Sequence, residues 1–130
     1  MLFFGHRFIP SKHFYHLSFI DSIKHTPSSS SIYISFSEKN IEILKHCVLN
    51  KVEIAVHVKN IAQLLYASAL GASYIVVEKE LAKSAQILAN NYLFDAKILA
   101  KIDEEEDIEE LAILGVDGVI FGNAIIKVNA

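Results

Sequence analysis

The sequence predicts a single α/β domain, spanning residues 1–130, made of repeated strand–helix units around a mostly parallel sheet. Five short runs rich in Ile and Val are the predicted strands, and their centres are spaced 22 residues apart, at Ile32, Ile54, Val76, Ile98 and Ile120. Each gap between them holds one helix-length segment whose apolar residues recur every three or four positions. With 130 residues, of which 52% are hydrophobic, the chain can bury a substantial core.

The N-terminal segment, residues 1–30, is less regular than the rest of the chain. A strand is expected at 2–5 or 2–9, and a short helix at 17–25. Pro27 and the serines after it predict a loop ahead of the first regular strand.

The regular repeats run from 31 to 122. Gly71 and Gly115 follow Leu-rich helix ends, where a left-handed residue is usually required. Asn60 is a suitable N-cap, and Asp103 with Glu106 has the spacing of a capping box. The helices are therefore expected to end before these glycines and to begin after these polar residues.

A closer internal match appears at twice the 22-residue spacing. It predicts that a βαβα unit of 44 residues occurs twice, at 49–78 and 93–122. Shared structure alone can produce such a match, so duplication remains a hypothesis. The matching stretches are LNKVEIAVHV with LFDAKILAKI, and LGASYIVV with LGVDGVIF.

Two sheet architectures fit this pattern: an open sheet and part of a β/α barrel. Parallel crossovers are nearly always right-handed, and both architectures satisfy that rule. A closed barrel needs eight strands and typically about 250 residues. We therefore expect a five- or six-stranded parallel sheet with flanking helices, either open or shaped like part of a barrel.

Composition excludes several classes of function. The net charge of −3 gives no basis for a nucleic-acid or anionic-membrane partner, and no stretch approaches the length of a membrane span. The first residues do not resemble a signal peptide, and the single cysteine, Cys47, is expected to be a buried side chain in a reducing, cytoplasmic compartment. Phosphate-loop, dinucleotide and nucleophile-elbow motifs are absent, so no cofactor is predicted.

Polar residues follow the predicted strands at the edge where α/β proteins bind ligands. His57, Glu78 and Lys101 are the candidate catalytic residues, with imidazole and carboxylate as acid and base and the ammonium neutralising an anion. The alternative is that they are ordinary polar residues ending buried strands. The strand-to-helix connections are only about two or three residues long, which argues against elaborate catalysis and leaves open whether the protein is an enzyme.

The helix at 61–70 is apolar nearly all round, which water would normally disfavour. We expect Ile61, Leu65 and Tyr66 to contact a second subunit, making the protein a homo-oligomer. The alternative is that the aromatic N-terminal segment covers this helix.

Two further clusters have simpler explanations. His13 and His16 have the spacing of two ligands on one helical turn, but no cluster of cysteines or carboxylates accompanies them, so no metal site is predicted. The acidic run at 103–110 fits a solvated helix start that complements the helix dipole, and an acidic docking face is the alternative.

The segment DEEEDIEELAILGVDGVIFGNAI, residues 103–125, resembles the last helix and strand of phosphate-binding β/α barrel enzymes through its glycines and Asp117. In those enzymes backbone amides after the final strand hold phosphate, which implies a ligand-binding role for Gly122 and Asn123. Glycerophosphodiester phosphodiesterases are similar here and also have a His-Arg pair after the first strand, as His6 and Arg7 do. Phe8 replaces the family's glycine, and the metal-binding Glu-x-Asp is absent, so the resemblance implies a shortened relative.

Two functions are consistent with the sequence. The first is a non-catalytic, self-associating or partner-binding module that takes a small anion or a protein partner. The second is a small or degenerate enzyme acting on a phosphorylated metabolite, a phosphodiester or a phosphate ester, at the carboxyl ends of the strands.

Overall fold

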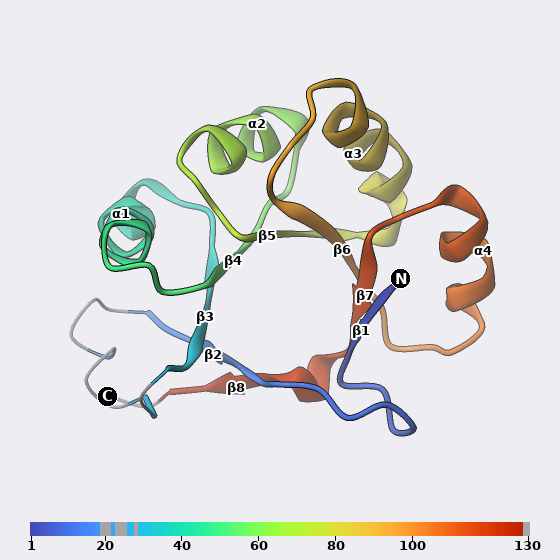
Figure 1. The fold of residues 1–130 in the computed structure, drawn as a ribbon, viewed down its shortest axis with the longest axis horizontal. Helices are drawn as coiled ribbons and strands as arrows, with labels where there is room; N and C mark the ends of the chain where they lie inside the picture. Colours follow the sequence, from blue (N-terminus) through green and yellow to red (C-terminus); the bar gives the residue numbers. More distant parts are fainter. Residues whose placement is uncertain (19–21, 23–25, 28, 129–130) are drawn as a thin grey trace.

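The computed structural model describes residues 1–18, 22, 26–27 and 29–128. Within them, one parallel sheet of eight strands curves into a half-barrel, and four α-helices lie along its outer side (Figure 1). The strand order is β1-β7-β6-β5-β4-β3-β2-β8. The strands are β1 (Leu2–Phe4), β2 (Phe14–His16), β3 (Ser31–Ser35), β4 (Ile54–His57), β5 (Tyr74–Glu78), β6 (Lys97–Lys101), β7 (Gly118–Ile120) and β8 (Ile125–Lys127). The helices are α1 (Ile41–Leu49), α2 (Ile61–Ala69), α3 (Lys79–Asn91) and α4 (Asp107–Leu114), with short 3-10 helices η2 (Glu38–Asn40) and η3 (Gly122–Ala124).

The regular part of the chain confirms the predicted alternation. Strands β3 to β7 coincide with the five Ile- and Val-rich runs, and α1 to α4 fill the four gaps between them. Neighbouring strands pair in parallel throughout, as the crossover connections require. The fold class predicted from the 22-residue spacing is therefore correct for this part.

The 22-residue spacing locates the strands but does not fix which way their side chains face. Ile54 and Ile98 belong to the outer core under the helices, whereas Val76 and Ile120 belong to the core inside the half-barrel. From β4 to β7, residues 44 positions apart do face the same way, as β/α barrels require when alternate strands share a layer. The rule does not extend to β3, because Ile32 lies in the outer core and Val76, 44 positions later, lies in the inner one.

Two apolar cores lie on the two faces of the sheet. The outer core fills the space between strands and helices, and includes Leu44, Leu64 and Leu111 from three of the helices. The inner core contains side chains from all eight strands, counting the partly buried Ile125 of β8, and from η3. Its buried members are Phe4, Phe14, Tyr33, Ala55, Val76, Leu99, Ile120 and Ala124.

The prediction of five or six strands was too low. The expected N-terminal strand is present as β1, and two more strands, β2 and β8, complete the eight. Both of these are only three residues long, and β8 follows β7 after η3 alone, without an intervening α-helix. The helix expected at 17–25 falls largely outside the described residues.

The edges of the sheet approach each other near Gly5, which follows β1. A Cβ atom on Gly5 would lie 2.5 Å from Asn123 Oδ1 and 3.0 Å from the Ala124 Cβ, both in η3. The residue also has a φ of +84°, a conformation that favours glycine. Gly5 thus permits β1 to end against η3, close to the start of β8.

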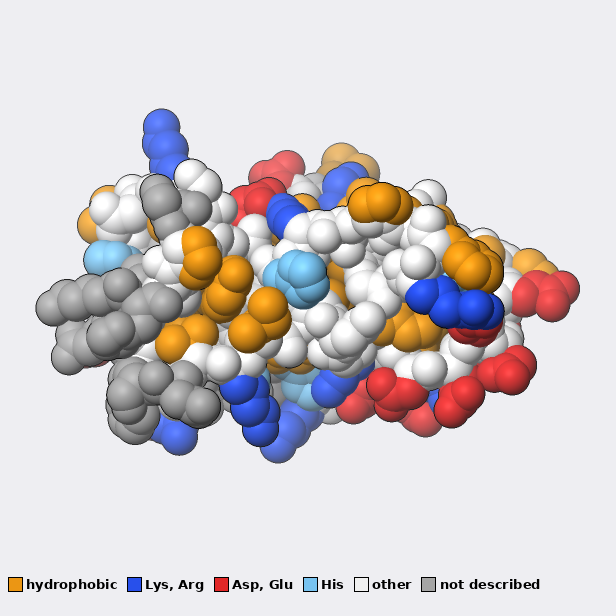
Figure 2. Space-filling model, turned by 90° about the horizontal axis from the view of Figure 1, so that it is seen from below, with side chains coloured by type: hydrophobic (Ala, Val, Ile, Leu, Met, Phe, Trp, Pro, Cys, Tyr) orange, Lys and Arg blue, Asp and Glu red, His pale blue; other side chains and the backbone are white. Residues whose placement is uncertain are grey.

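The helices are not spread evenly around the sheet. They cover β3 to β7, and no described helix lies over β2 and β8 (Figure 1). Figure 2 looks onto that side and shows hydrophobic side chains among basic ones. Ile126 of β8 is 38% exposed. Among the described residues, no helix is long and apolar enough to span a membrane.

Most of the predicted helix ends are confirmed. Gly71 and Gly115 have φ values of +95° and +82°, and the Asn60 side chain accepts a hydrogen bond of 2.9 Å from the backbone N–H of Gln63. The capping box at Asp103 is wrong, because α4 begins only at Asp107.

Candidate ligand site at the carboxyl ends of the strands

Side chains that face the interior of the half-barrel are apolar in the middle of the strands and polar at their carboxyl ends, because every second residue of a strand faces the same way. In β4, for example, Ala55 lies in the inner core and His57 is the next side chain on that face. The same step leads from Phe14 to His16 and from Leu99 to Lys101. We call the resulting group the mouth cluster, made up of His16, Tyr33, His57, Glu78, Lys101 and Lys127.

Tyr33 forms the floor between the two histidines. Its ring centroid lies 5.1 Å from that of His16, edge-on, and 6.4 Å from that of His57, nearly parallel. Tyr33 is buried, and burial together with the charge of Glu78 raises the pKa of its hydroxyl. The phenol therefore stays protonated and holds the two imidazoles apart.

His57 and Glu78 face each other at the ends of β4 and β5. Nε2 of His57 lies 3.9 Å from Oε1 of Glu78, which is too long for a hydrogen bond. The histidine side chain is only 16% exposed, whereas that of Glu78 is 57% exposed. Lys101 is the register partner of Glu78 on the neighbouring strand β6, so the two side chains leave the sheet on the same face.

Both imidazoles of the mouth cluster resist protonation. Burial is the main cause that lowers the pKa of His57, and the nearby charges of Lys101 and Lys59 lower it further against the opposing effect of Glu78. Burial also lowers the pKa of His16, followed by the charges of Lys127, Lys101 and His57. With neutral imidazoles, two lysines and one glutamate give the cluster a net positive charge.

Unpaired polar atoms gather at this end of the sheet. Among the described residues, three buried side-chain atoms have no hydrogen-bond partner: Nε2 of His57, Oγ of Ser37 and Oδ1 of Asn40. Ser37 and Asn40 follow β3, and His57 ends the neighbouring β4. Buried polar groups in folded proteins are nearly always paired, so this concentration at one edge needs an explanation.

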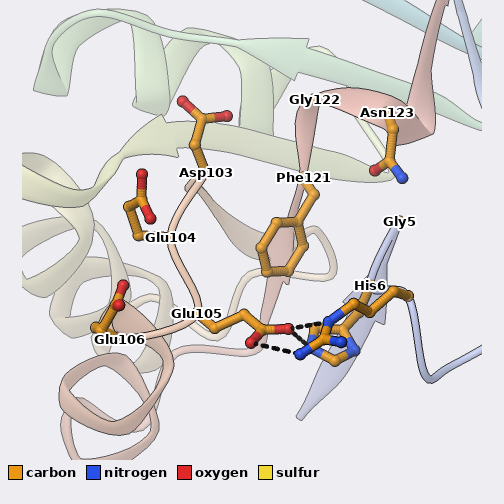
Figure 3. A pocket seen from close by; sticks show the side chains of 10 residues that line it. Gly5, His6, Asp103, Glu104, Glu105, Glu106, Phe121, Gly122 and Asn123 are labelled. Atoms are coloured by element: carbon orange, nitrogen blue, oxygen red, sulfur yellow. Dashed lines mark hydrogen bonds and ion pairs between the residues drawn. The ribbon is translucent and has the colours of Figure 1, made fainter.

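A side pocket of about 510 Å³ lies next to the mouth cluster, along the ends of β1, β6 and β7 (Figure 3). Glu105 reaches across it and contacts Nε2 of His6 at 2.9 Å, and it also accepts two hydrogen bonds of 2.8 and 3.2 Å from Arg7. The carboxylates of Asp103 and Glu104 point away from His6. The pocket is lined by Gly5, His6, Arg7, Asp103, Glu104, Glu105, Glu106, Phe121, Gly122 and Asn123.

The predicted site residues thus fall into two groups at one edge of the sheet. His57, Glu78 and Lys101 belong to the mouth cluster, while the side pocket contains all four candidate ligand-binding residues, His6, Arg7, Gly122 and Asn123. The backbone of Gly122 is close to Asp103, because a Cβ added there would lie 3.8 Å from Oδ1 of Asp103. The side pocket is therefore acidic around the glycine.

Metal ligation receives no support from the residues described. His13 precedes a strand and His16 ends it, so the two do not share a helical turn. No group of three or more His, Cys, Asp or Glu side chains in the described part of the chain is arranged to hold a metal ion. Cys47 is fully buried, and burial raises the pKa of its thiol to about 11, as expected for an unreactive core residue.

Sequence reasoning missed His16, Lys127 and Glu105. His16 was considered only for its helical spacing from His13, although its two-residue spacing from Phe14 also fits a strand with both side chains inward. Lys127 lies in β8, which follows β7 without an intervening α-helix and was not expected as a strand. Glu105 binds Arg7 across 98 residues of sequence, and nothing local signals that contact.

The expected interface residues lie on α2, away from both clusters. Leu65 is 39% exposed and Tyr66 is 56% exposed, while Ile61 packs against the outer core. The N-terminal aromatics Phe4 and Phe14 lie inside the half-barrel. Leu65 and Tyr66 therefore retain exposed apolar surface.

Neither the models of known protein families nor the curated proteins give a match to this chain. The functional conclusion must therefore come from the geometry and charge of the mouth cluster. Three features support it: an unpaired buried imidazole nitrogen, a carboxylate facing it, and the ammonium groups of Lys101 and Lys127, whose charges both act on His16.

Proposed function

We propose that this protein binds a small anionic molecule, carrying a phosphate or a chemically similar group, at the mouth cluster. The observation that carries the proposal is the buried Nε2 of His57, which has no partner and lies 3.9 Å from Glu78 in a positively charged setting. A bound anion would pair with Lys101 and Lys127, and an accompanying hydroxyl would reach the imidazole. Binding would then give this nitrogen a hydrogen-bond partner and restore the free energy that the free protein loses by leaving it unpaired.

The same arrangement is suited to proton transfer. A neutral imidazole can accept a proton from a hydroxyl, and a carboxylate facing it would stabilise the imidazolium that forms. The two lysines would stabilise negative charge on a phosphoryl oxygen. Hydrolysis or transfer at a phosphate ester or phosphodiester is the reaction class we propose for this site, in keeping with the phosphodiesterase resemblance of residues 103–125.

The binding step is tested by amide NMR during titration with inorganic phosphate at low salt. We expect saturable shifts at His16, His57 and Lys101. Lys101→Ala should weaken affinity about ten- to a hundredfold, because it removes one charge-assisted contact. The control is Lys83→Ala, which removes the same charge from the exposed face of α3 and should leave affinity unchanged.

Two results would contradict the binding proposal. One is a titration in which no residue of the mouth cluster shifts. The other is equal affinity in Lys101→Ala and Lys83→Ala, which would mean that the anion binds to charge in general. Phosphodiester hydrolysis that is lost in His57→Ala while phosphate still binds would identify an enzyme, and undetectable hydrolysis by the wild type would leave a binding module.

A second candidate function is a self-associating module, which a reducing, cytoplasmic location would suit. The supporting observation is α2, which carries no charged residue and exposes Leu65 and Tyr66. Leu65→Glu should convert a dimer into a monomer in sedimentation, with little change in the stability of each subunit. Leu49→Glu on α1, which is also exposed, is the matched control, and a monomeric wild type would end this idea.

A further inference from the structure

A second polar cluster closes the opposite, amino end of the half-barrel. Nζ of Lys12 lies 5.0 Å from the ring centre of Tyr74, 5.6 Å from that of Phe14 and 5.9 Å from that of Phe4. The three rings pack edge-on around a triangle, with centroid separations of 5.1, 5.5 and 5.6 Å. All three distances to the ammonium fall within the range of cation–π attraction.

A carboxylate completes this enclosure. Glu53 accepts a hydrogen bond from Lys12 and a second one, of 3.1 Å, from the hydroxyl of Ser31. Lys12 also donates to the Tyr74 hydroxyl at 3.2 Å. Three aromatic faces and one carboxylate around a cation are the combination by which proteins recognise ammonium groups, including methylated ones.

The enclosure does not depend on Lys12 for its construction. Phe4, Phe14 and Tyr74 belong to β1, β2 and β5, and Glu53 directly precedes β4. Phe4 and Phe14 are buried in the inner core, which holds their rings in place. Lys12 instead comes from the irregular segment between β1 and β2, and its side chain is 36% exposed, so the cation lies at a solvent-accessible end.

The electrostatics of the pair agree with a bound cation. Burial lowers the pKa of Lys12, but its hydrogen bonds to Glu53 and Tyr74 outweigh that effect and the pKa is raised overall. The pKa of Glu53 is lowered, mainly by its hydrogen bond from Lys12.

We propose that the amino end of the half-barrel is an ammonium-binding cage, formed by Phe4, Phe14, Tyr74 and Glu53, that Lys12 occupies as an internal ligand. When Lys12 leaves, the cage takes an alkylammonium group, primary or methylated, from another molecule. This site is independent of the anion site at the other end of the strands.

By occupying the cage, Lys12 also attaches the segment between β1 and β2 to the amino end of the half-barrel. That segment is held near its start by the contacts of His6 and Arg7 with Glu105, and near its end by Lys12. A competing ammonium ligand would release the second attachment without touching the first. The cage is thus a point at which an ammonium ligand that binds more tightly than Lys12 would loosen the N-terminal segment, whereas a weaker one would enter only after Lys12 is removed.

The test uses Lys12→Ala in the full chain, with tetramethylammonium chloride as the probe and sodium chloride at equal ionic strength as the reference. We expect saturable NMR shifts of the Tyr74 and Phe14 ring protons, together with a rise in the thermal unfolding midpoint. The wild type and Lys83→Ala should show neither at the same concentrations, because Lys12 fills their cage. Adding Glu53→Gln to Lys12→Ala should weaken binding of the probe at least fivefold.

Two outcomes would overturn the proposal: no saturable response in Lys12→Ala, or the same response in the wild type and Lys83→Ala. If Lys12→Ala does not fold in sodium chloride, the readout becomes rescue. Recovery of a cooperative unfolding transition with tetramethylammonium supports the cage, and failure of the probe to restore folding contradicts it.

Discussion

The two ends of the half-barrel contain similar side chains in opposite states of pairing. Each has a tyrosine, a glutamate and at least one lysine. At the amino end Lys12, Glu53 and Tyr74 satisfy one another. At the carboxyl end Nε2 of His57 is buried without a partner, and Glu78 lies 3.9 Å from it.

This difference separates a closed end from an open one. A buried polar group without a partner lowers stability by about 1–3 kcal/mol, so a folded protein tolerates it where something else requires it. The amino end has filled its cage from within. The carboxyl end has kept its hydrogen-bonding capacity, which is why we place the anion site there.

The largest expected effect is a loss of stability, and it tests whether the inner core supports the polar clusters at both ends of the half-barrel. Phe14 is fully buried and its ring borders the Lys12 cage, while the next inward residue on its strand is His16. Phe14→Ala should lower the free energy of unfolding by about 3–5 kcal/mol, because it opens a cavity in the inner core. Urea denaturation measures this loss.

The matched control is Phe8→Ala, since Phe8 is 70% exposed and its ring lies beneath Arg7. Its cost should stay below about 1 kcal/mol. Equal losses in the two variants would mean that the inner core does not support the two ends in the way described.

The next effect separates the ends from each other. Lys12→Ala should lower the free energy of unfolding by about 1–2 kcal/mol, through loss of a partly exposed ion pair and cation–π contacts, and should leave phosphate affinity unchanged. Lys101→Ala should instead weaken phosphate affinity and leave the free energy of unfolding within about 0.5 kcal/mol of wild type. Urea unfolding and phosphate titration of both variants give the comparison, and loss of stability in Lys101→Ala with no change in affinity would refute it.

A smaller effect concerns pH. The pKa values of His16 and His57 are lowered in the folded state, mainly by burial, so the unfolded chain binds protons more readily. Stability should be full above their ordinary pKa of about 6.5 and should fall as the pH drops toward 5. Urea unfolding over this range should show a flatter dependence in His57→Gln than in wild type, and an unchanged slope would count against the buried imidazole.

The amino end should respond at lower pH. Hydrogen bonding from Lys12 lowers the pKa of Glu53, so its contribution is present above the unfolded value of 4.5 and is lost as the pH falls through the lower folded value. Glu53→Gln should remove that acid-sensitive part while leaving the slope between pH 7 and 5 as in wild type. A changed slope in the neutral range would show that the two ends are electrostatically coupled.

The sequence predicted β3 to β7 because each is a separate apolar run between helical segments. It could not reveal β2, whose three residues mix Phe14 with His16, nor β8, which follows β7 without a helix. Short strands of this kind are set by pairing with neighbours and not by local propensity. Because these two short strands could not be recognised, the sequence also left open the number of strands and how far the sheet curves.

The candidate site was predictable in part. His57, Glu78 and Lys101 were expected at one edge because parallel strands end together. Sequence spacing could not tell that Nε2 of His57 would be buried and unpaired, because that depends on strand stagger and on the position of Tyr33. The contact between Arg7 and Glu105 likewise depends on how the sheet brings β1 beside β7.

The most direct test of the anion site is to measure the pKa values of His16 and His57 by NMR, with and without inorganic phosphate. An anion bound among these rings stabilises their protonated forms, so we expect phosphate to raise both pKa values, while the ring signals of His46, on α1, do not respond to phosphate. If phosphate shifts all three histidines equally, or none of them, the mouth cluster does not bind an anion and the unpaired nitrogen of His57 needs another explanation.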